Sequence, residues 1–447
     1  MIAEAPARSR PFDRQLLVAP AVAVVAAAVF GLLIAVALSL SPPSWTAVFT
    51  IGIGLVVVLA IALAWLDVAV LLGLFLLPFV RVEPAPPDLV FGVVIAVSLL
   101  TGRFTLQRVP ASIFFIVGSF LALNLLSAMD AVNVSLAARY GLITLYLIVF
   151  AFWLTSYLNS PARARLIVRG YVYTAAVVAV VAVAAVNADF PGADLLRQGT
   201  DYRALGPFKD PNVFGQFLIP AMLLALHEFV APRLLPARPL VNVALVASMA
   251  VGIFFSYSRS AWAGAIVGTF TMFLIVVLRR GGIRRAAPFV ALIVIAAGTV
   301  AAAIAVTGAV QFIDERARFQ SYDSNRFAAQ REGIRVVADH PFGIGPGQFE
   351  EALRYAAHST YVRALTENGF IGLGLIAGLM LVTLLLATRN VFGGRQTFGI
   401  GSAPLLGSWV AILGASTVID TIHWRHFWLV AALIWAATMR GALATPR

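Results

Sequence analysis

Long apolar runs recur along this chain and leave little room for any fold outside a lipid bilayer. An α-helix rises 1.5 Å per residue, so about 20 apolar residues cross a hydrocarbon core about 30 Å thick. Only 12% of the residues are charged, against about 25% in typical soluble domains. The sequence therefore predicts an all-α polytopic integral membrane protein. The expected spans are residues 16–40, 45–65, 67–81, 88–101, 110–128, 137–157, 165–186, 212–230, 240–257, 260–278, 287–308, 368–387, 403–419 and 425–441.

The number and grouping of these spans follow from their lengths. Two runs, at 67–81 and 88–101, are short, so we expect about 12 to 14 transmembrane helices. One helical bundle accounts for the whole chain, and we predict a single transmembrane domain over residues 1–447. The first run is longer than the core of a signal peptide and is expected to remain as an anchor. The chain has no cysteine, which excludes disulfides and thiolate metal sites.

The distribution of charge predicts the orientation. With the N-terminus in the cytoplasm, the cytoplasmic side holds 18 of the 32 basic residues and only 4 of the 20 acidic ones. This excess follows the positive-inside rule, so both termini are expected in the cytoplasm. It also explains the net charge of +12 without a nucleic-acid partner. The outer side then receives residues 187–211, the turn at 256–261 and a large extracytoplasmic loop at 309–367.

The extracytoplasmic loop has the pattern of two helices joined by turns. Residues 324–337 can form an amphipathic helix. Residues 340–347 include two prolines and three glycines, which predicts tight turns. A second helix is expected to start near Gln348. Three of its polar residues would share one face through their spacing of three and four: Arg354, His358 and Tyr361.

Three basic residues lie at the outer ends of predicted spans, where they can bind an anionic group. Arg259 stands in a polar turn between two spans; it either has an anionic partner or reaches to the interface. Arg203 and Lys209, the only lysine, precede a span whose first backbone amides favour phosphate oxygens. The alternative is an ordinary capped loop in which Asp210 neutralises Lys209.

Two histidine positions complete the candidate residues. A neutral His358 can accept a proton from a hydroxyl near pH 7, although a lone histidine is often structural. His423 and Arg425 belong to an aromatic outer-face cluster with Asp420, and a zinc site there needs a third ligand. The chain lacks GxxxxGK[ST], HExxH and GxSxG, so nucleotide hydrolysis, zinc proteolysis and serine-elbow acyl transfer have no support.

Several of these segments, in their order and spacing, resemble the motifs of the O-antigen ligase and polymerase family of bacterial membrane glycosyltransferases. They are residues 203–212, 258–261, 340–349, 358–361, 367–372 and 423–425. They define an O-antigen ligase-like catalytic region at residues 187–447, whereas the part of the chain before this region matches only as hydrophobic spans.

The resemblance implies a fold of the GT-C type and a glycan donor carried on undecaprenyl diphosphate. The active site would face the periplasm at the outer face of the bacterial inner (cytoplasmic) membrane. The enzyme would move the glycan to a hydroxyl of lipid A core, of another glycan or of a different acceptor. Its pathway would be the biosynthesis of lipopolysaccharide or a related surface polysaccharide, and membrane lipids would surround it.

The resemblance also assigns roles to residues. Arg203 and Arg259 would bind the diphosphate, with Arg259 also acting in catalysis, and His358 would be the base or the acceptor-positioning group. Lys209 would be a further phosphate contact, although the family often has a small polar residue or glycine there. Paired guanidinium groups stabilise the leaving group, so we expect no metal and no cofactor, and in-line attack would invert the anomeric centre. Four residues are placed around the acceptor or in support of the site: Tyr361, Arg354, His423 and Arg425.

Two other functions compete with glycan ligation. A polymerase would share the same motifs and add lipid-linked repeats to each other. A transporter or flippase for lipid-linked glycans would line a central cavity with cations at mid-membrane depth, whereas the candidate cations here cluster at the outer ends of the spans.

Overall fold

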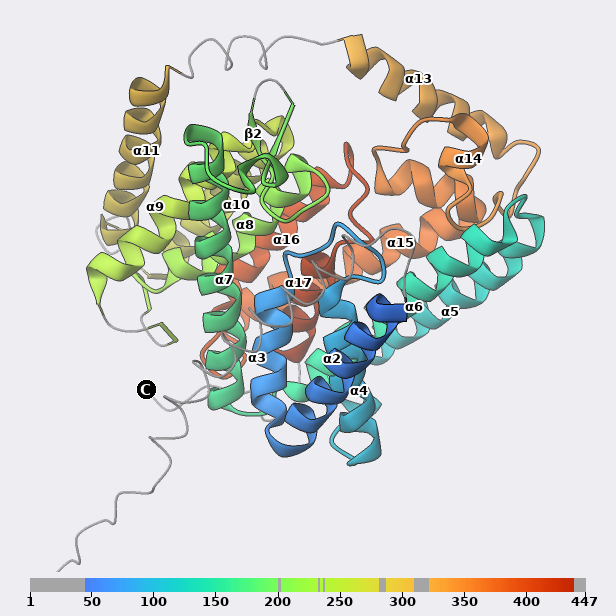
Figure 1. Ribbon diagram of the computed structural model, residues 1–447, viewed down its shortest axis with the longest axis horizontal. Coiled ribbons are helices and arrows are strands. Elements are labelled where there is room, and N and C mark those ends of the chain that lie inside the picture. Colours follow the sequence, from blue (N-terminus) through green and yellow to red (C-terminus); the bar gives the residue numbers. More distant parts are fainter. Residues whose placement is uncertain are drawn as a thin grey trace, which may run out of the picture. The chain divides into compact units, whose positions relative to one another are not determined.

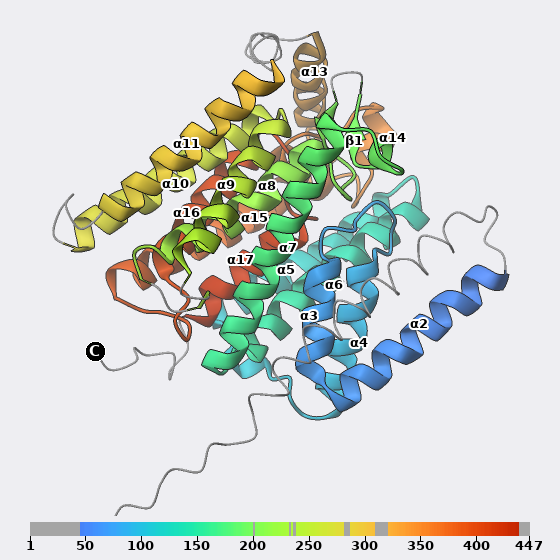
Figure 2. The same ribbon diagram turned by 60° about the vertical axis from the view of Figure 1, so that its left-hand side comes forward.

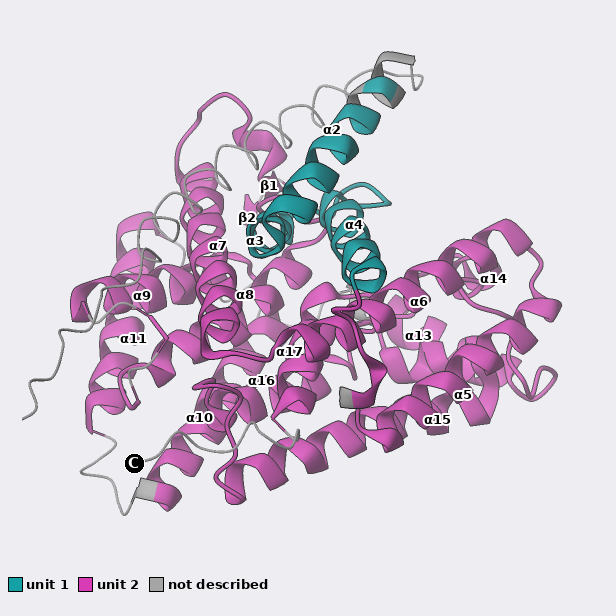
Figure 3. Cartoon of the chain, turned by 90° about the horizontal axis from the view of Figure 1, so that it is seen from below, with its two compact units in different colours: residues 1–101 teal, residues 102–447 magenta. Residues whose placement is uncertain are grey.

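The computed structural model describes residues 45–199, 202–231, 234–235, 238–280, 287–308 and 321–437. These residues are largely helical, which confirms the all-α fold. The chain divides into two compact units, residues 1–101 and 102–447 (Figure 3). The predicted span at 16–40 lies outside the described residues, and the single transmembrane domain stays a prediction.

The first unit packs three apolar helices against one another: α2 (Trp45–Ala64), α3 (Leu66–Leu76) and α4 (Pro86–Leu100), drawn in blue in Figure 2. A glycine lets two of them approach closely. A Cβ added to Gly73 of α3 would lie 2.7 Å from the ring of Phe91 in α4, so any larger residue would push these helices apart.

The second unit holds the remaining helices and one short antiparallel hairpin (Figure 1). Its elements are η1 (Leu106–Arg108), α5 (Ala111–Ser127), η2 (Ala128–Asp130), α6 (Val134–Tyr157), α7 (Pro161–Asn187), η3 (Ala193–Leu195), β1 (Arg197–Gln198), β2 (Arg203–Ala204), α8 (Pro211–His227), α9 (Pro239–Phe255), α10 (Arg259–Arg280), α11 (Ala287–Thr307), α13 (Ser321–Val336), α14 (Phe349–Leu353), α15 (Thr360–Phe392), α16 (Ser402–Ala415) and α17 (Arg425–Ala436).

The centre of the second unit is made of helices that are apolar on all sides. Every residue of α17 after Arg425 is buried, and α8 is buried along nearly its whole length. Small residues set the spacing between α10 and α16, because a Cβ on Gly407 would lie 2.5 Å from the carbonyl oxygen of Gly268. Close approach at small residues is the usual way in which membrane helices pack.

Six of the described helices are long and apolar enough to cross a membrane: α5 with η2, α6, α7, α10, α11 and α15. The other apolar helices have 10 to 17 residues, with α2 counted from Ile51. These lengths and compositions indicate a multi-pass membrane protein, as the sequence predicts. The number of 12 to 14 transmembrane helices and the GT-C type stay predictions.

The described part of the predicted extracytoplasmic loop confirms one predicted helix and shortens the other. The amphipathic helix is α13, and the turns follow it. The second helix starts where predicted, with Gln348 as the N-cap of α14. Its continuation to Tyr361 is wrong, because α14 ends at Leu353, Arg354 has a φ of 58° and His358 has a φ of 45°. A spacing of three and four shares a face only along an unbroken helix, and these left-handed residues interrupt it. Arg354, His358 and Tyr361 therefore do not share one helical face.

The glycine-rich turns lie directly on a kink in α15. Gly369 has a φ of 68° inside this helix, and a Cβ on it would collide with the carbonyl oxygen of Pro341. A Cβ on Gly343 would collide with the carbonyl oxygen of Glu367, and Gly345 N donates to the same oxygen at 3.0 Å. Only glycine fits such backbone-to-backbone contact, so these residues fix the loop onto the start of α15.

Candidate functional site

Arg203 joins the hairpin loop to the turn that precedes Arg259. Its Nε donates to the carbonyl oxygen of Ser256 at 3.1 Å. Its Nη2 lies 3.5 Å from both the carbonyl oxygen of Tyr257 and Oδ1 of Asn212. These carbonyls follow the last residue of α9, where a helix leaves acceptors without intrahelical donors. Arg203 therefore caps α9 and brings its own loop to the second predicted arginine motif.

The turn before α10 is fixed by its own hydroxyls and by α8. Ser258 Oγ accepts from Ala261 N at 3.3 Å, an N-cap contact that starts α10 at Arg259. A Cβ on Gly215 of α8 would lie 2.7 Å from Ser256 Oγ, so α8 packs tightly on the turn. Arg259 is half-buried at the first position of α10. The positive end of that helix dipole lies beside it, which suits an anionic ligand.

The segment Lys209–Asp210 behaves as a capped loop. Asp210 is the N-cap of α8, and its Oδ1 accepts from Asn212 N at 2.6 Å and from Asn212 Nδ2 at 2.7 Å. The alternative of an ordinary capped loop is thus confirmed for Asp210. The backbone amide of Asn212 is already bonded to the carboxylate of Asp210. Lys209 is exposed, and its contact with phosphate stays a prediction.

His358 is held by α13, which packs beside α14 and α15 in Figure 1. Its Nδ1 lies 2.9 Å from Nη2 of Arg326. Nε2 of Gln330, one helical turn further along α13, donates to the carbonyl oxygens of Ala357 at 3.2 Å and of His358 at 3.1 Å. Two side chains of one helix therefore fix the ring and the backbone of this histidine.

The surroundings of His358 keep its ring neutral. Burial and the adjacent Arg326 charge lower its pKa to about 4, with Arg363 acting in the same direction and the carboxylates of Asp210 and Glu350 opposing it. The imidazole is therefore uncharged at pH 7.

A buried charge cluster around Arg363 escaped the sequence reasoning. Arg363 Nη1 lies 2.7 Å from Oε1 of Glu367, its Nε lies 3.0 Å from Oδ2 of Asp420, and its Nη2 contacts Glu350. The side chains of Arg363 and Glu367 are only 8% and 5% exposed. We call these four residues the Arg363 cluster. An arginine and a glutamate four residues apart at the start of an apolar helix were the signal that could have revealed it.

The Arg363 cluster also holds the glycine-rich loop. The carboxylate of Glu367 accepts from Gly347 N at 2.9 Å and from Phe349 N at 3.2 Å. Gln348, between them, exchanges hydrogen bonds of 2.9 and 3.1 Å with the backbone N and O of Asn133 at the start of α6. The loop is therefore bonded to two helices through one carboxylate and one amide.

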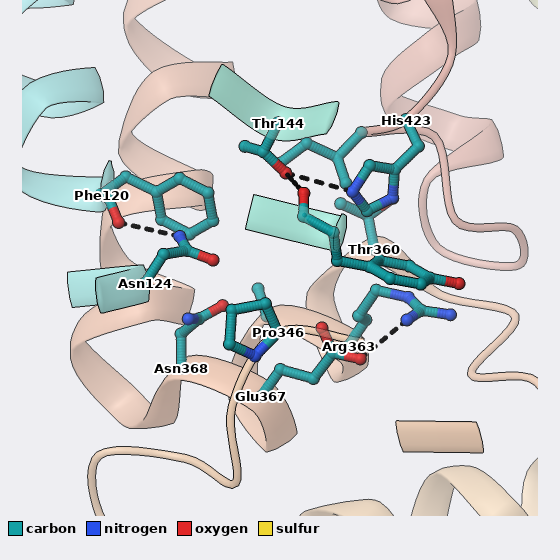
Figure 4. Close-up of a pocket in the computed structure, with 12 residues that line it drawn as sticks. Phe120, Asn124, Thr144, Pro346, Thr360, Arg363, Glu367, Asn368 and His423 are labelled. Carbon is teal, nitrogen blue, oxygen red and sulfur yellow. Dashed lines mark hydrogen bonds and ion pairs between the residues drawn. The ribbon is translucent and has the colours of Figure 1, made fainter. Parts of the chain in front are cut away.

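His423 belongs to the Arg363 side of the molecule. Its Nδ1 lies 3.3 Å from Oδ2 of Asp420 and its Nε2 lies 3.2 Å from Oγ1 of Thr144. Burial raises the pKa of Asp420, but the Arg363 charge, the interaction with His423 and the backbone amide of Ile422 together keep that pKa well below its usual range. A cavity of about 20 Å³, enough for one water molecule, is lined by Thr144, Arg363 and His423 among others (Figure 4).

The remaining predicted residues have varied positions. Arg354 is exposed and forms the left-handed cap of α14. Tyr361 is half-buried in the first turn of α15, and Arg425 is half-buried at the first position of α17. Their roles around the acceptor stay predictions.

Comparison with known proteins supports the motif resemblance. Residues 244–377 match the family model described as O-antigen ligase. A search among curated proteins finds no match. The matched segment includes Arg259 and His358, lies inside the predicted catalytic region at 187–447, and ends before His423. The predicted resemblance to the O-antigen ligase family is thus confirmed over residues 244–377.

Proposed function

We propose that this protein is a membrane glycosyltransferase that moves a glycan from undecaprenyl diphosphate to an acceptor hydroxyl at the outer face of the inner membrane. The O-antigen ligase match supports the class of reaction. The apolar helices support a site at a membrane surface, where a lipid-linked donor is held by its chain. The donor lipid, the side of the membrane and the acceptor are parts of the proposal.

The observation that carries the proposal is the link between the two arginine motifs. The guanidinium of Arg203 donates to the carbonyl oxygen of Ser256, in the turn that leads to Arg259. Two motifs that lie far apart in the sequence are therefore joined at one turn, which supports a two-cation diphosphate site. The carboxylate of Asp210, in the same loop as Arg203, favours protonation of His358, which supports a common site for the three motifs.

The chemistry follows from these positions. Arg203 and Arg259 bind the diphosphate oxygens and stabilise the negative charge that develops on them as the glycosidic bond breaks. The acceptor oxygen, beside His358, forms the new bond to the anomeric carbon on the opposite side, so the configuration inverts. The electron pair of the broken bond leaves with the diphosphate oxygen, and the proton of the acceptor hydroxyl is released to solvent.

The test is glycan transfer by the purified protein in lipid, with a lipid-linked glycan, candidate acceptors and a chelator. We expect His358→Ala, Arg259→Ala and Arg203→Ala each to lower the transfer rate about 100-fold or more. Arg335→Ala is the matched control, because Arg335 is an exposed arginine of α13 whose Nη1 contacts Glu332 on the same helix.

The result with different acceptors also separates the competing functions. Transfer to lipid A core identifies a ligase, and transfer to a second lipid-linked repeat identifies a polymerase. Movement of the donor across the bilayer without transfer, or full activity in all three variants, would overturn the proposal.

A further inference from the structure

A hydrogen bond between α13 and the histidine motif determines how His358 can act. Nη2 of Arg326 lies 2.9 Å from Nδ1 of His358. A guanidinium has only N–H donors and stays protonated at any pH at which the protein is folded. Nδ1 must therefore offer its lone pair, and the proton of the neutral ring must be on Nε2.

We propose that Arg326 is a positioning residue that holds His358 as an Nε2–H hydrogen-bond donor to a substrate oxygen, instead of as the base that removes the acceptor proton. This inference rests on the proposed glycan transfer. The N–H of the ring orients the acceptor hydroxyl through a lone pair of its oxygen. No bond of the imidazole is made or broken in the step.

Three further features of the site support a fixed donor. Gln330 donates to the carbonyl oxygens of Ala357 and His358. Because Arg326 contacts the imidazole, α13 restrains both the backbone and the ring of His358. The left-handed φ of 45° at His358 is a strained conformation for a residue with a side chain, and it persists only where neighbours hold it. Ser359, the next residue, caps α15 by accepting from Val362 N at 3.4 Å.

The charged groups around the ring agree with a donor. Arg326 from α13 and Arg363 from α15 disfavour a second proton on His358, whereas Asp210 at the start of α8 and Glu350 of α14 favour it. With burial added, the pKa falls to about 4, and a ring of that pKa is a weak base at pH 7. A hydrogen-bond donor needs no basicity and works at every pH above this value.

The role of Arg326 is tested with Arg326→Met, Arg326→Lys and Arg335→Met in the purified full-length protein. We expect Arg326→Met to lower kcat about 10- to 100-fold, because the ring loses its tautomer and its orientation. Arg326→Lys, which keeps a charged donor, should recover most of that loss, and Arg335→Met should match wild type. If His358 were the base, losing Arg326 would raise its basicity, so an unchanged or faster Arg326→Met enzyme would overturn the inference.

The titration of His358 gives a readout that a purely structural role would not change. Removal of the Arg326 charge raises the pKa of His358, so its titration, followed by NMR of labelled histidine, should move to higher pH in Arg326→Met. The titration should stay in place in Arg335→Met. An unchanged titration of His358 in Arg326→Met would contradict the proposed contact.

Nitrogen NMR of protein with labelled histidine tests the tautomer without any substrate. The chain has five histidines, and His358→Ala identifies the signal of interest. We expect Nε2–H in wild type and a mixture of tautomers in Arg326→Met; Nδ1–H in wild type would overturn the inference. A wild-type protein that shows the expected tautomer but transfers no glycan would instead overturn the proposed function alone.

Discussion

Arg363 and Arg203 both place a guanidinium beside the apolar helices, but they bind different kinds of oxygen. Arg363 contacts three carboxylates, which come from α14, from α15 and from the segment before α17. Arg203 binds the carbonyl oxygens of Ser256 and Tyr257 and the side chain of Asn212. The first arginine holds helices together by opposite charge, and the second joins the two loops that carry the predicted arginine motifs.

This difference shows that an arginine in an apolar region does not by itself mark a ligand site. A buried ion pair costs desolvation that its own Coulomb attraction largely repays, so it is stable only as a complete set. The Arg363 cluster is such a set. We therefore expect substitutions there to act on folding, and substitutions at Arg203 to act on the reaction.

The largest effect is expected from Arg363→Met. It keeps most of the side-chain volume but removes the shared partner of Glu367, Asp420 and Glu350. Loss of one member of a buried ion pair costs about 3–5 kcal/mol of unfolding free energy. Thermal unfolding in detergent should show a clear fall in Tm and a lower yield of folded protein. A Tm equal to that of wild type would mean that the cluster does not stabilise the fold.

Arg203→Met should show the opposite balance. Its hydrogen bonds to carbonyl oxygens contribute about 0.5–1.5 kcal/mol each to stability, so the protein should still fold. Glycan transfer should fall about 100-fold, because a diphosphate loses one of two guanidinium groups. Comparing Tm with the initial rate of transfer separates the two effects. Normal glycan transfer with a low Tm in Arg203→Met would show that Arg203 acts on folding and not on the reaction.

Glu367→Gln should have the smallest effect on stability among the cluster variants. The amide keeps an oxygen for Gly347 N and Phe349 N but loses the charge that faces Arg363. We expect a loss of about 1–3 kcal/mol, less than for Arg363→Met, because Asp420 and Glu350 still neutralise the arginine. Chemical unfolding measures the difference. If Glu367→Gln lost more unfolding free energy than Arg363→Met, the Glu367 carboxylate would stabilise the protein mainly through the glycine-rich loop and not through the Arg363 cluster.

The spans were predictable because helix length and hydropathy are local properties. The runs at 137–157 and 260–278 correspond to α6 and α10 within a few residues. The predicted helix carrying Arg354, His358 and Tyr361 failed because a local spacing rule does not reveal a left-handed residue. The left-handed conformation of His358 is held by contacts with α13, a separate helix that comes earlier in the chain.

The sequence by itself determined an all-α membrane protein and the motifs of the O-antigen ligase family, because apolar length and residue order are written in the chain. The tertiary structure decided which charges and polar groups meet. Arg363 of α15 contacts Asp420 before α17, Arg203 of β2 contacts Ser256 after α9, and Arg326 of α13 contacts His358 before α15. These pairs depend on how helices pack, and the energy of a buried charge depends on its neighbours in space and not on its neighbours in sequence.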